Sequence, residues 1–193
     1  MIDYIKGNIT QITPAYVVIE TGGVGYFINI SLTTYAKLEG KEQFRILVHE
    51  VIREDAHQLF GFAGKEEREI FRLLISVSGV GAATARMMLS SLTPVEIDRA
   101  ITGSDVNLLK SIKGIGLKTA QRIIVDLKDK LGKPSDTGEI FAFSDNTKRE
   151  EALSALVMLG FAKNAVLKVL DRILKEERDL SVEDLIKRAL KNL

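Results

Sequence analysis

The sequence contains two copies of a short glycine turn that leads into a helical pattern. "SVSGVGAATARMMLSSL" occupies residues 76–92, and "SIKGIGLKTAQRIIVDL" follows it at an offset of 35 residues. The positions that match in register are Gly79 and Gly114, Gly81 and Gly116, Thr84 and Thr119, and Ala85 and Ala120. A glycine turn at a helix N-terminus presents unpaired backbone N–H groups and the positive end of the helix dipole, which together can bind a phosphate.

The residue types in both copies suit a phosphate clamp built from the backbone. Glycine has no side chain to block close approach, and it adopts positive φ at little cost. The residues predicted to contact phosphates are Gly79, Gly81, Ala83, Thr84, Gly114, Gly116, Lys118, Thr119 and Arg122. One isolated Gly-x-Gly is more often a plain turn between helices. Two copies in register favour paired clamps, which bind phosphates and do not read bases.

Positive charge is concentrated around the second copy. The chain as a whole carries 27 basic and 26 acidic residues, for a net charge of +1. Residues 110–133 hold seven basic and two acidic residues, whereas residues 1–63 hold five and seven. A local basic region on a nearly neutral protein is typical of contact with a polyanion.

The segment before the clamps, residues 1–63, has the pattern of β-strands. Apolar residues alternate in "VGYFINI" and "FRILVHEV", and Gly22-Gly23 between two such patterns predicts a tight hairpin. Five strands with one short helical turn near residues 33–38 favour a small five-stranded barrel. An open sandwich fits almost as well.

The clamps themselves lie in a region of helical periodicity, residues 64–131, which predicts an all-α domain. In each copy a helix, the glycine turn and a second helix follow one another. Thr93 and Glu96 form a predicted capping box for a helix that ends at Gly103. Asp105 or Ser104 is expected to cap the next, short helix.

A polar, glycine- and proline-containing segment at residues 132–147 predicts a flexible linker. Three helical patterns follow, at residues 149–159, 164–175 and 182–190, and predict a bundle over residues 148–193. A bundle this small is marginally stable alone and often serves to bind a partner. The predicted fold class is therefore a multidomain α+β protein.

Several classes of chemistry are disfavoured. The chain has no cysteine, and its two histidines are too few for a histidine-based metal site, so we expect no metal and no cofactor. "GFAGKE" and "GIGLKT" both lack the spacing of a P-loop, so a partner would have to supply ATP hydrolysis if the function consumes ATP. No apolar run approaches the ~20 residues of a membrane span, and no signal peptide is visible, which predicts a cytoplasmic protein without membrane contact.

The chain resembles the RuvA family, the Holliday-junction-binding subunits of bacterial branch-migration complexes. The resemblance rests on segments that occur in this order: "TGGVGYFINI", "IREDAHQLFGF", the two glycine hairpins, "KTAQRIIVDLKDKL" and "EALSALVMLGF". It covers essentially the whole chain. It implies an OB-fold barrel, a tandem helix-hairpin-helix domain and a three-helix, UBA-like domain.

The resemblance also implies a function and partners. Four subunits would surround a Holliday junction in DNA recombination, repair and the SOS response, as one tetramer or as two that face each other. The protein would be non-catalytic, with the AAA+ motor RuvB supplying ATP hydrolysis and the RuvC resolvase joining the same complex. The implied acidic pin is Glu54 and Asp55, and the residues expected to bind RuvB are Leu156, Leu159 and Phe161. From residue types alone, the acids fit a solvated turn and the leucines fit core packing.

This chain departs from the family pattern beside both clamps. Ala82-Ala83 and Leu117 stand where family members often carry lysine. Fewer lysines release fewer counterions, so we expect a shallower salt dependence of DNA binding than in lysine-rich relatives.

Two other functions are compatible with parts of the sequence. A helix-hairpin-helix glycosylase or nuclease would need a catalytic carboxylate, for which Asp126, alone or paired with Asp129 around Mg²⁺, is the nearest candidate. A single-strand-binding barrel would need exposed aromatic residues, whereas Tyr26 and Phe44 alternate as core residues do.

Overall fold

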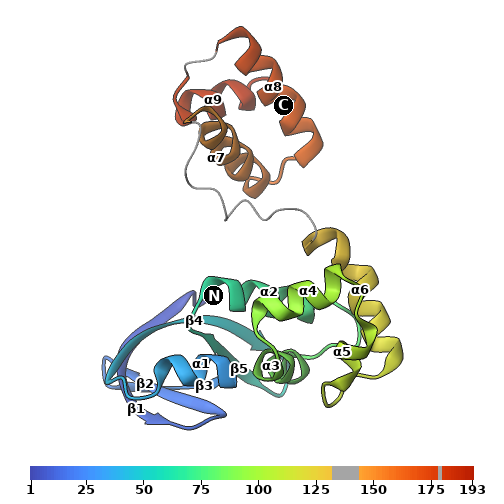
Figure 1. Cartoon of the computed structure of the whole chain (residues 1–193). Helices are drawn as coiled ribbons and strands as arrows, with labels where there is room; N and C mark the ends of the chain where they lie inside the picture. The colour runs from blue at the N-terminus through green and yellow to red at the C-terminus, as the bar shows by residue number, and fades with distance from the viewer. Residues whose placement is uncertain (132–143, 178–179) are drawn as a thin grey trace. The chain divides into compact units, whose positions relative to one another are not determined.

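A computed structural model describes residues 1–131, 144–177 and 180–193. The chain divides into two compact units, Met1–Ser135 and Asp136–Leu193 (Figure 1). Of the predicted linker, residues 132–143 lie outside the described residues, and residues 144–147 begin a helix.

The N-terminal part of the first unit is a closed five-stranded barrel with the strand order β1-β2-β3-β5-β4. Its elements are β1 (Tyr4–Ile12), β2 (Tyr16–Thr21), β3 (Val24–Ile30), α1 (Leu32–Leu38), β4 (Gln43–Ile52) and β5 (His57–Phe62). Gly22 and Gly23 both have positive φ, 59° and 78°, as the predicted hairpin requires. The parallel pairing of β3 with β5 closes the barrel and rules out the open sandwich.

Alternating apolar residues fill the barrel as the sequence predicts. Ile28 and Ile30 of β3 and Ile46 and Val48 of β4 are buried. Gly61 is required by this packing, because a Cβ at this position would come within 2.5 Å of Ile46 and 2.6 Å of Ile28. The barrel interior is therefore full of side chains.

The second part of the first unit is the predicted helical domain. Its helices are α2 (Lys65–Ile75), α3 (Ala82–Ser91), α4 (Pro94–Thr102), α5 (Val106–Ser111) and α6 (Leu117–Leu131). The Thr93–Glu96 capping box is present at the start of α4. Asp105, and not Ser104, caps α5 by accepting a hydrogen bond from the Leu108 N–H.

The barrel interior has its own hydrophobic core, and strand β5 also contributes Phe60 and Phe62 to the core of the helices. This is where α2 packs against β4 and β5 (Figure 1). The ring of Phe71 on α2 lies 5.2 Å from that of Phe60 and 4.9 Å from that of Phe62, both on β5. Burial of three aromatic rings at this contact holds the two parts together as one body.

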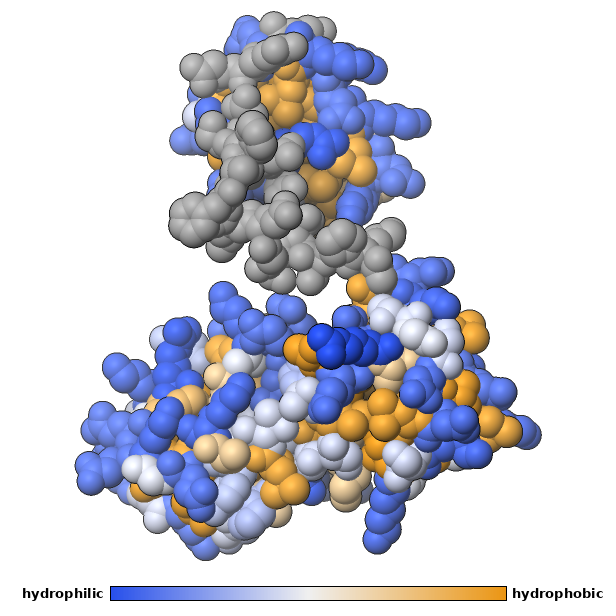
Figure 2. All heavy atoms as spheres, viewed as in Figure 1, coloured by the Kyte–Doolittle hydropathy of each residue, from blue (hydrophilic) through white to orange (hydrophobic). Residues whose placement is uncertain are grey.

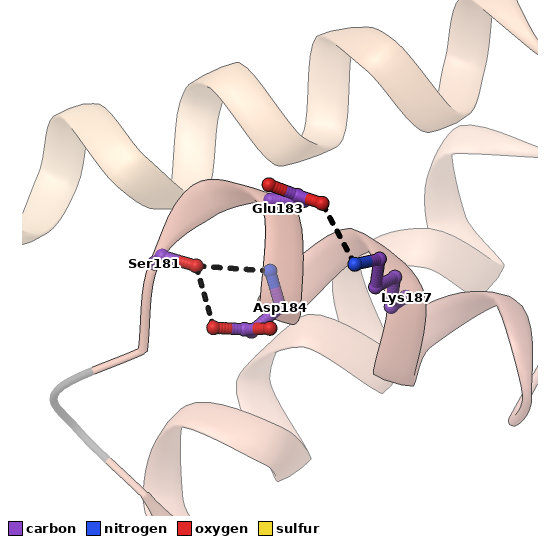
Figure 3. A network of polar contacts seen from close by, with 4 residues as sticks. All are labelled: Ser181, Glu183, Asp184 and Lys187. Carbon is purple, nitrogen blue, oxygen red and sulfur yellow. Dashed lines mark hydrogen bonds and ion pairs between the residues drawn. The ribbon is translucent and has the colours of Figure 1, made fainter.

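The second unit contains α7 (Ser144–Met158), α8 (Lys163–Glu176) and α9 (Val182–Leu190). Its buried residues are Ala152, Leu156, Val166, Leu170, Ile173, Leu180, Leu185 and Ala189. Ser181 caps α9: its Oγ accepts from the Asp184 N–H at 3.1 Å and lies 2.7 Å from an Asp184 carboxylate oxygen (Figure 3). Lys187 pairs with Glu183 one turn earlier, at 2.7 Å.

Candidate nucleic-acid interface

The two glycine turns have the same backbone geometry. Gly79 and Gly114 both have a φ of 92°, a left-handed conformation that favours glycine. Both turns contain the same backbone hydrogen bond. The Val80 N–H donates to the Val77 carbonyl at 3.0 Å, and the Ile115 N–H donates to the Ile112 carbonyl at 3.1 Å. The matched positions that anchor the turns in the core are Val77 and Ile112, Val80 and Ile115, and Ala85 and Ala120. The repeat seen in the sequence is therefore a repeat in three dimensions.

The second glycine of each turn is not explained by the fold. Neither Gly81 nor Gly116 has positive φ, and a Cβ added to either would meet no atom within 4 Å. Every other glycine in the described parts of the chain has positive φ or an atom within 3.4 Å of an added Cβ. Serine or aspartate would cap the following helix better and would have room. These two glycines are what close approach by an external group requires.

Both following helices start with an open, positive end. The first N–H groups of a helix have no partner within the helix, and Gly81 supplies no side-chain cap for α3. Neither α3 nor α6 has an acidic residue in its first turn. An external anion can therefore accept hydrogen bonds from the N-terminus of α3 and from the N-terminus of α6.

The start of α4 shows the contrast within the same domain. There the Glu96 carboxylate accepts from the Thr93 N–H at 2.8 Å, so the helix binds its own anion. Hydrogen bonds from the Thr93 backbone, and then from its hydroxyl, lower the pKa of Glu96. This N-terminus is closed to outside ligands.

The two clamps differ in charge. Lys118, in the first turn of α6, is exposed beside the second clamp. Arg122 is also exposed and lies 3.9 Å from Asp126. At the first clamp Ala83 occupies the position of Lys118. The basic residue of α3, Arg86, donates instead to barrel acceptors.

Arg86 has a structural role that the sequence did not indicate. Its guanidinium donates to the Ala15 carbonyl at 2.9 Å and to the Asn29 amide oxygen at 3.2 Å. Both acceptors belong to the barrel, so Arg86 ties the helix of the first clamp to it. The first clamp consequently depends on its backbone groups.

The acidic turn lies at the end of the β4–β5 hairpin. The strands pair as far as Ile52 and His57, and the Arg53 N–H donates to the Ala56 carbonyl at 2.8 Å. Glu54 and Asp55 are exposed between these residues. Both carboxylates are thus at the tip, where they can meet an external molecule.

The residues on which the other functions would depend are placed less favourably. Asp126 is an exposed partner of Arg122. In the described parts of the chain no three His, Cys, Asp or Glu side chains group as a metal site would require. Tyr26 and Phe44 pack against the barrel core, which does not suit base stacking.

The three residues expected to bind a motor are placed differently from one another. The prediction for Leu156 needs correction, because Leu156 is 0% exposed and forms part of the core of the second unit. Phe161 packs partly against that core, whereas Leu159 is 63% exposed. Met158, which the sequence pattern did not single out, is 86% exposed, and apolar side chains reach the surface of this unit among hydrophilic ones (Figure 2). Within the described residues no helix is both long and apolar enough to span a membrane.

Comparison with protein families covers nearly the whole chain. Residues 1–61 match the RuvA N terminal domain, residues 71–129 match the SAM-like helix-hairpin-helix tandem, and residues 147–193 match the RuvA C-terminal domain.

Full-length relatives carry one shared name. Proteins named "Holliday junction branch migration complex subunit RuvA" are 53% identical in Christiangramia forsetii and 51% identical in Bacteroides thetaiotaomicron, each with 100% of both chains covered. The protein of that name in Cytophaga hutchinsonii is 47% identical over 99% of both chains.

Proposed function

This chain belongs to the RuvA family, and on that premise we propose that it binds Holliday junctions through their phosphates and serves branch migration in recombination and repair. The observation that carries the proposal is the pair Gly81 and Gly116, which lack side chains where the fold leaves room for them. Backbone amides at two such turns bind the sugar-phosphate chain and leave the bases unread. Binding is then specific for DNA structure and not for sequence.

Each subunit would grip one duplex arm with both clamps. The second clamp adds the charge of Lys118, while the first relies on the N-terminus of α3. Because Phe60 and Phe62 of β5 belong to the core of the helices, the hairpin that carries the acidic turn is attached to the domain that carries the clamps. Each subunit would therefore attract the phosphates of the arm through its clamps and repel phosphates at the acidic turn.

In a tetramer, four copies of Glu54 and Asp55 would gather at the crossover. Their repulsion of phosphates is screened over ~10 Å at ordinary ionic strength, so it would act only on strands near the centre. Such a pin guides separated strands and disfavours continuous duplex. A second tetramer on the opposite face, and RuvC in the same complex, are compatible with this arrangement.

The second unit would recruit the RuvB motor. Leu159 is exposed, Phe161 is accessible in part, and Met158 adds apolar surface beside them. RuvB would supply ATP hydrolysis, and this chain would be non-catalytic. It would act in the cytoplasm, where bacterial chromosomal DNA lies.

A competition gel shift tests the proposal, with a four-way junction against linear duplex of matched length. We expect a clear preference for the junction, and a rise in duplex affinity when Glu54→Gln and Asp55→Asn are combined. Equal affinity of the wild-type chain for both DNAs would refute structure-specific binding.

A further inference from the structure

Glu67 on α2 is a buried acid at the join of barrel and helices. It is 2% exposed, and acidic residues are rarely buried to this degree unless they are paired. In the described parts of the chain no cation lies within 4.0 Å of its carboxylate. The partners of Glu67 must therefore come from elsewhere.

Two hydroxyl groups of the barrel satisfy this carboxylate. Ser31 donates to its Oε1, and Thr34 donates to its Oε2 at 2.7 Å. Each hydroxyl also accepts a backbone hydrogen bond, at 3.0 Å from the Thr34 N–H to Ser31 and at 3.0 Å from the Ala63 N–H to Thr34. Every member of this buried network has partners, which makes its geometry specific.

The network connects three segments at the one place where the chain leaves the barrel. Ser31 caps α1, Ala63 follows β5 directly, and Glu67 lies in the first turn of α2. On its other side α1 is bonded to α3, since Thr33 donates to the Leu89 carbonyl at 2.8 Å. A shift at Glu67 would thus move β5, and the helix of the first clamp, relative to each other.

The nearby apolar contacts do not fix this geometry as strictly. The contacts among Phe60, Phe62 and Phe71 are apolar and have no strict directional requirement. Such packing tolerates small shifts in position better than hydrogen bonds do. The acidic turn lies at the far end of the β4–β5 hairpin, so a small rotation at the base of β5 becomes a larger displacement at Glu54 and Asp55.

We infer that Glu67 is a positioning residue for junction specificity: its buried carboxylate sets where the acidic turn stands relative to the phosphate clamps. This inference rests on the proposed function. It assigns Glu67 no contact with DNA. Glu67 acts on the junction only through the position of the pin.

The test is a double-mutant cycle in the full-length protein. Glu67→Leu removes both acceptors at similar volume, and Glu67→Gln retains one acceptor and is expected to fold. Each is combined with the neutral pin, Glu54→Gln with Asp55→Asn, and dissociation constants are measured for junction and linear duplex. Glu66→Gln is the matched control, because the neighbouring Glu66 is exposed and loses the same charge.

With the acidic pin present, we expect Glu67→Leu to lower the junction-over-duplex ratio by about two- to tenfold, and Glu67→Gln to lower it less. With the neutral pin, Glu67 variants should change the ratio no further. Glu66→Gln should leave it unchanged in both backgrounds. Denaturant unfolding of each variant shows that the measured protein is folded.

Two results would indicate general loosening and overturn the inference: an equal effect of Glu67 variants in both backgrounds, or a parallel loss of junction and duplex affinity. A ratio that depends on the pin but is indifferent to Glu67 defeats the inference alone. A wild-type chain without junction preference defeats the proposed function, and the inference with it.

Discussion

The substitution Gly116→Ala separates the needs of the fold from those of DNA binding. An added methyl at Gly116 meets no atom of the protein within 4 Å, and the backbone is not in the left-handed region. At Gly114, two residues earlier, φ is 92°, so alanine there strains the chain itself. The same chemical change therefore has different consequences at the two glycines of one turn.

Opposing effects on stability nearly cancel at Gly116. Alanine restricts the unfolded chain and stabilises by about 0.4–1 kcal/mol, whereas its poorer N-cap preference destabilises by a similar amount. In DNA binding, one lost hydrogen bond to a charged phosphate costs about 1.5–3 kcal/mol, which is roughly a ten- to hundredfold weaker Kd. At Gly114, left-handed alanine costs about 1–2 kcal/mol of folding free energy.

The measurements are denaturant unfolding and gel-shift titration with a four-way junction. Gly64→Ala is the matched control, because Gly64 also has negative φ and directly precedes a helix, α2. The atom nearest to a Cβ added there is a carboxylate oxygen of the flexible Glu66 side chain, at 3.1 Å. We expect unchanged junction affinity for Gly64→Ala. A Gly116→Ala protein with wild-type stability and wild-type junction affinity would refute the phosphate clamp.

Three further predictions address charge, motor binding and pH. Lys118→Ala should reduce the slope of log K against log salt by about 1, measured by junction titration from low to moderate salt, and an unchanged slope would show that Lys118 does not meet a phosphate. Leu159→Glu should abolish stimulation of the RuvB ATPase while junction affinity and thermal stability stay unchanged; normal stimulation would exclude Leu159 from the contact. Burial first, and then the nearby Arg72 guanidinium, lower the pKa of His49, so the folded state favours the neutral ring and stability should fall as pH drops below the unfolded value of about 6.5. Denaturant unfolding at pH 7.5 and 5.5 checks this. His49→Gln should reduce the difference in unfolding free energy between the two pH values, and an unchanged difference would show that His49 does not cause it.

The sequence predicted the strands, the helices and the two glycine turns, because the signals for them are local. Alternation in "VGYFINI" reports which side of a strand is buried, and the Thr93–Glu96 box marks a helix start within four residues. The glycine repeat was visible because both copies preserve the residues that face the core. The sequence could not distinguish the two glycines of a turn, because Gly79 and Gly81 differ in their backbone conformation: only Gly79 has positive φ, and Gly81 has open space for a Cβ without that requirement.

The sequence by itself determined the order of strands and helices, the two turns and the basic stretch beside the second. Tertiary structure decided barrel closure, the burial of Leu156 against the exposure of Leu159, and the engagement of Arg86 by the barrel. It also decided the network at Glu67, whose partner Ser31 is 36 residues away. The physical reason is range: periodicity arises between residues a few positions apart, whereas burial and hydrogen bonding join residues that only the folded chain brings together.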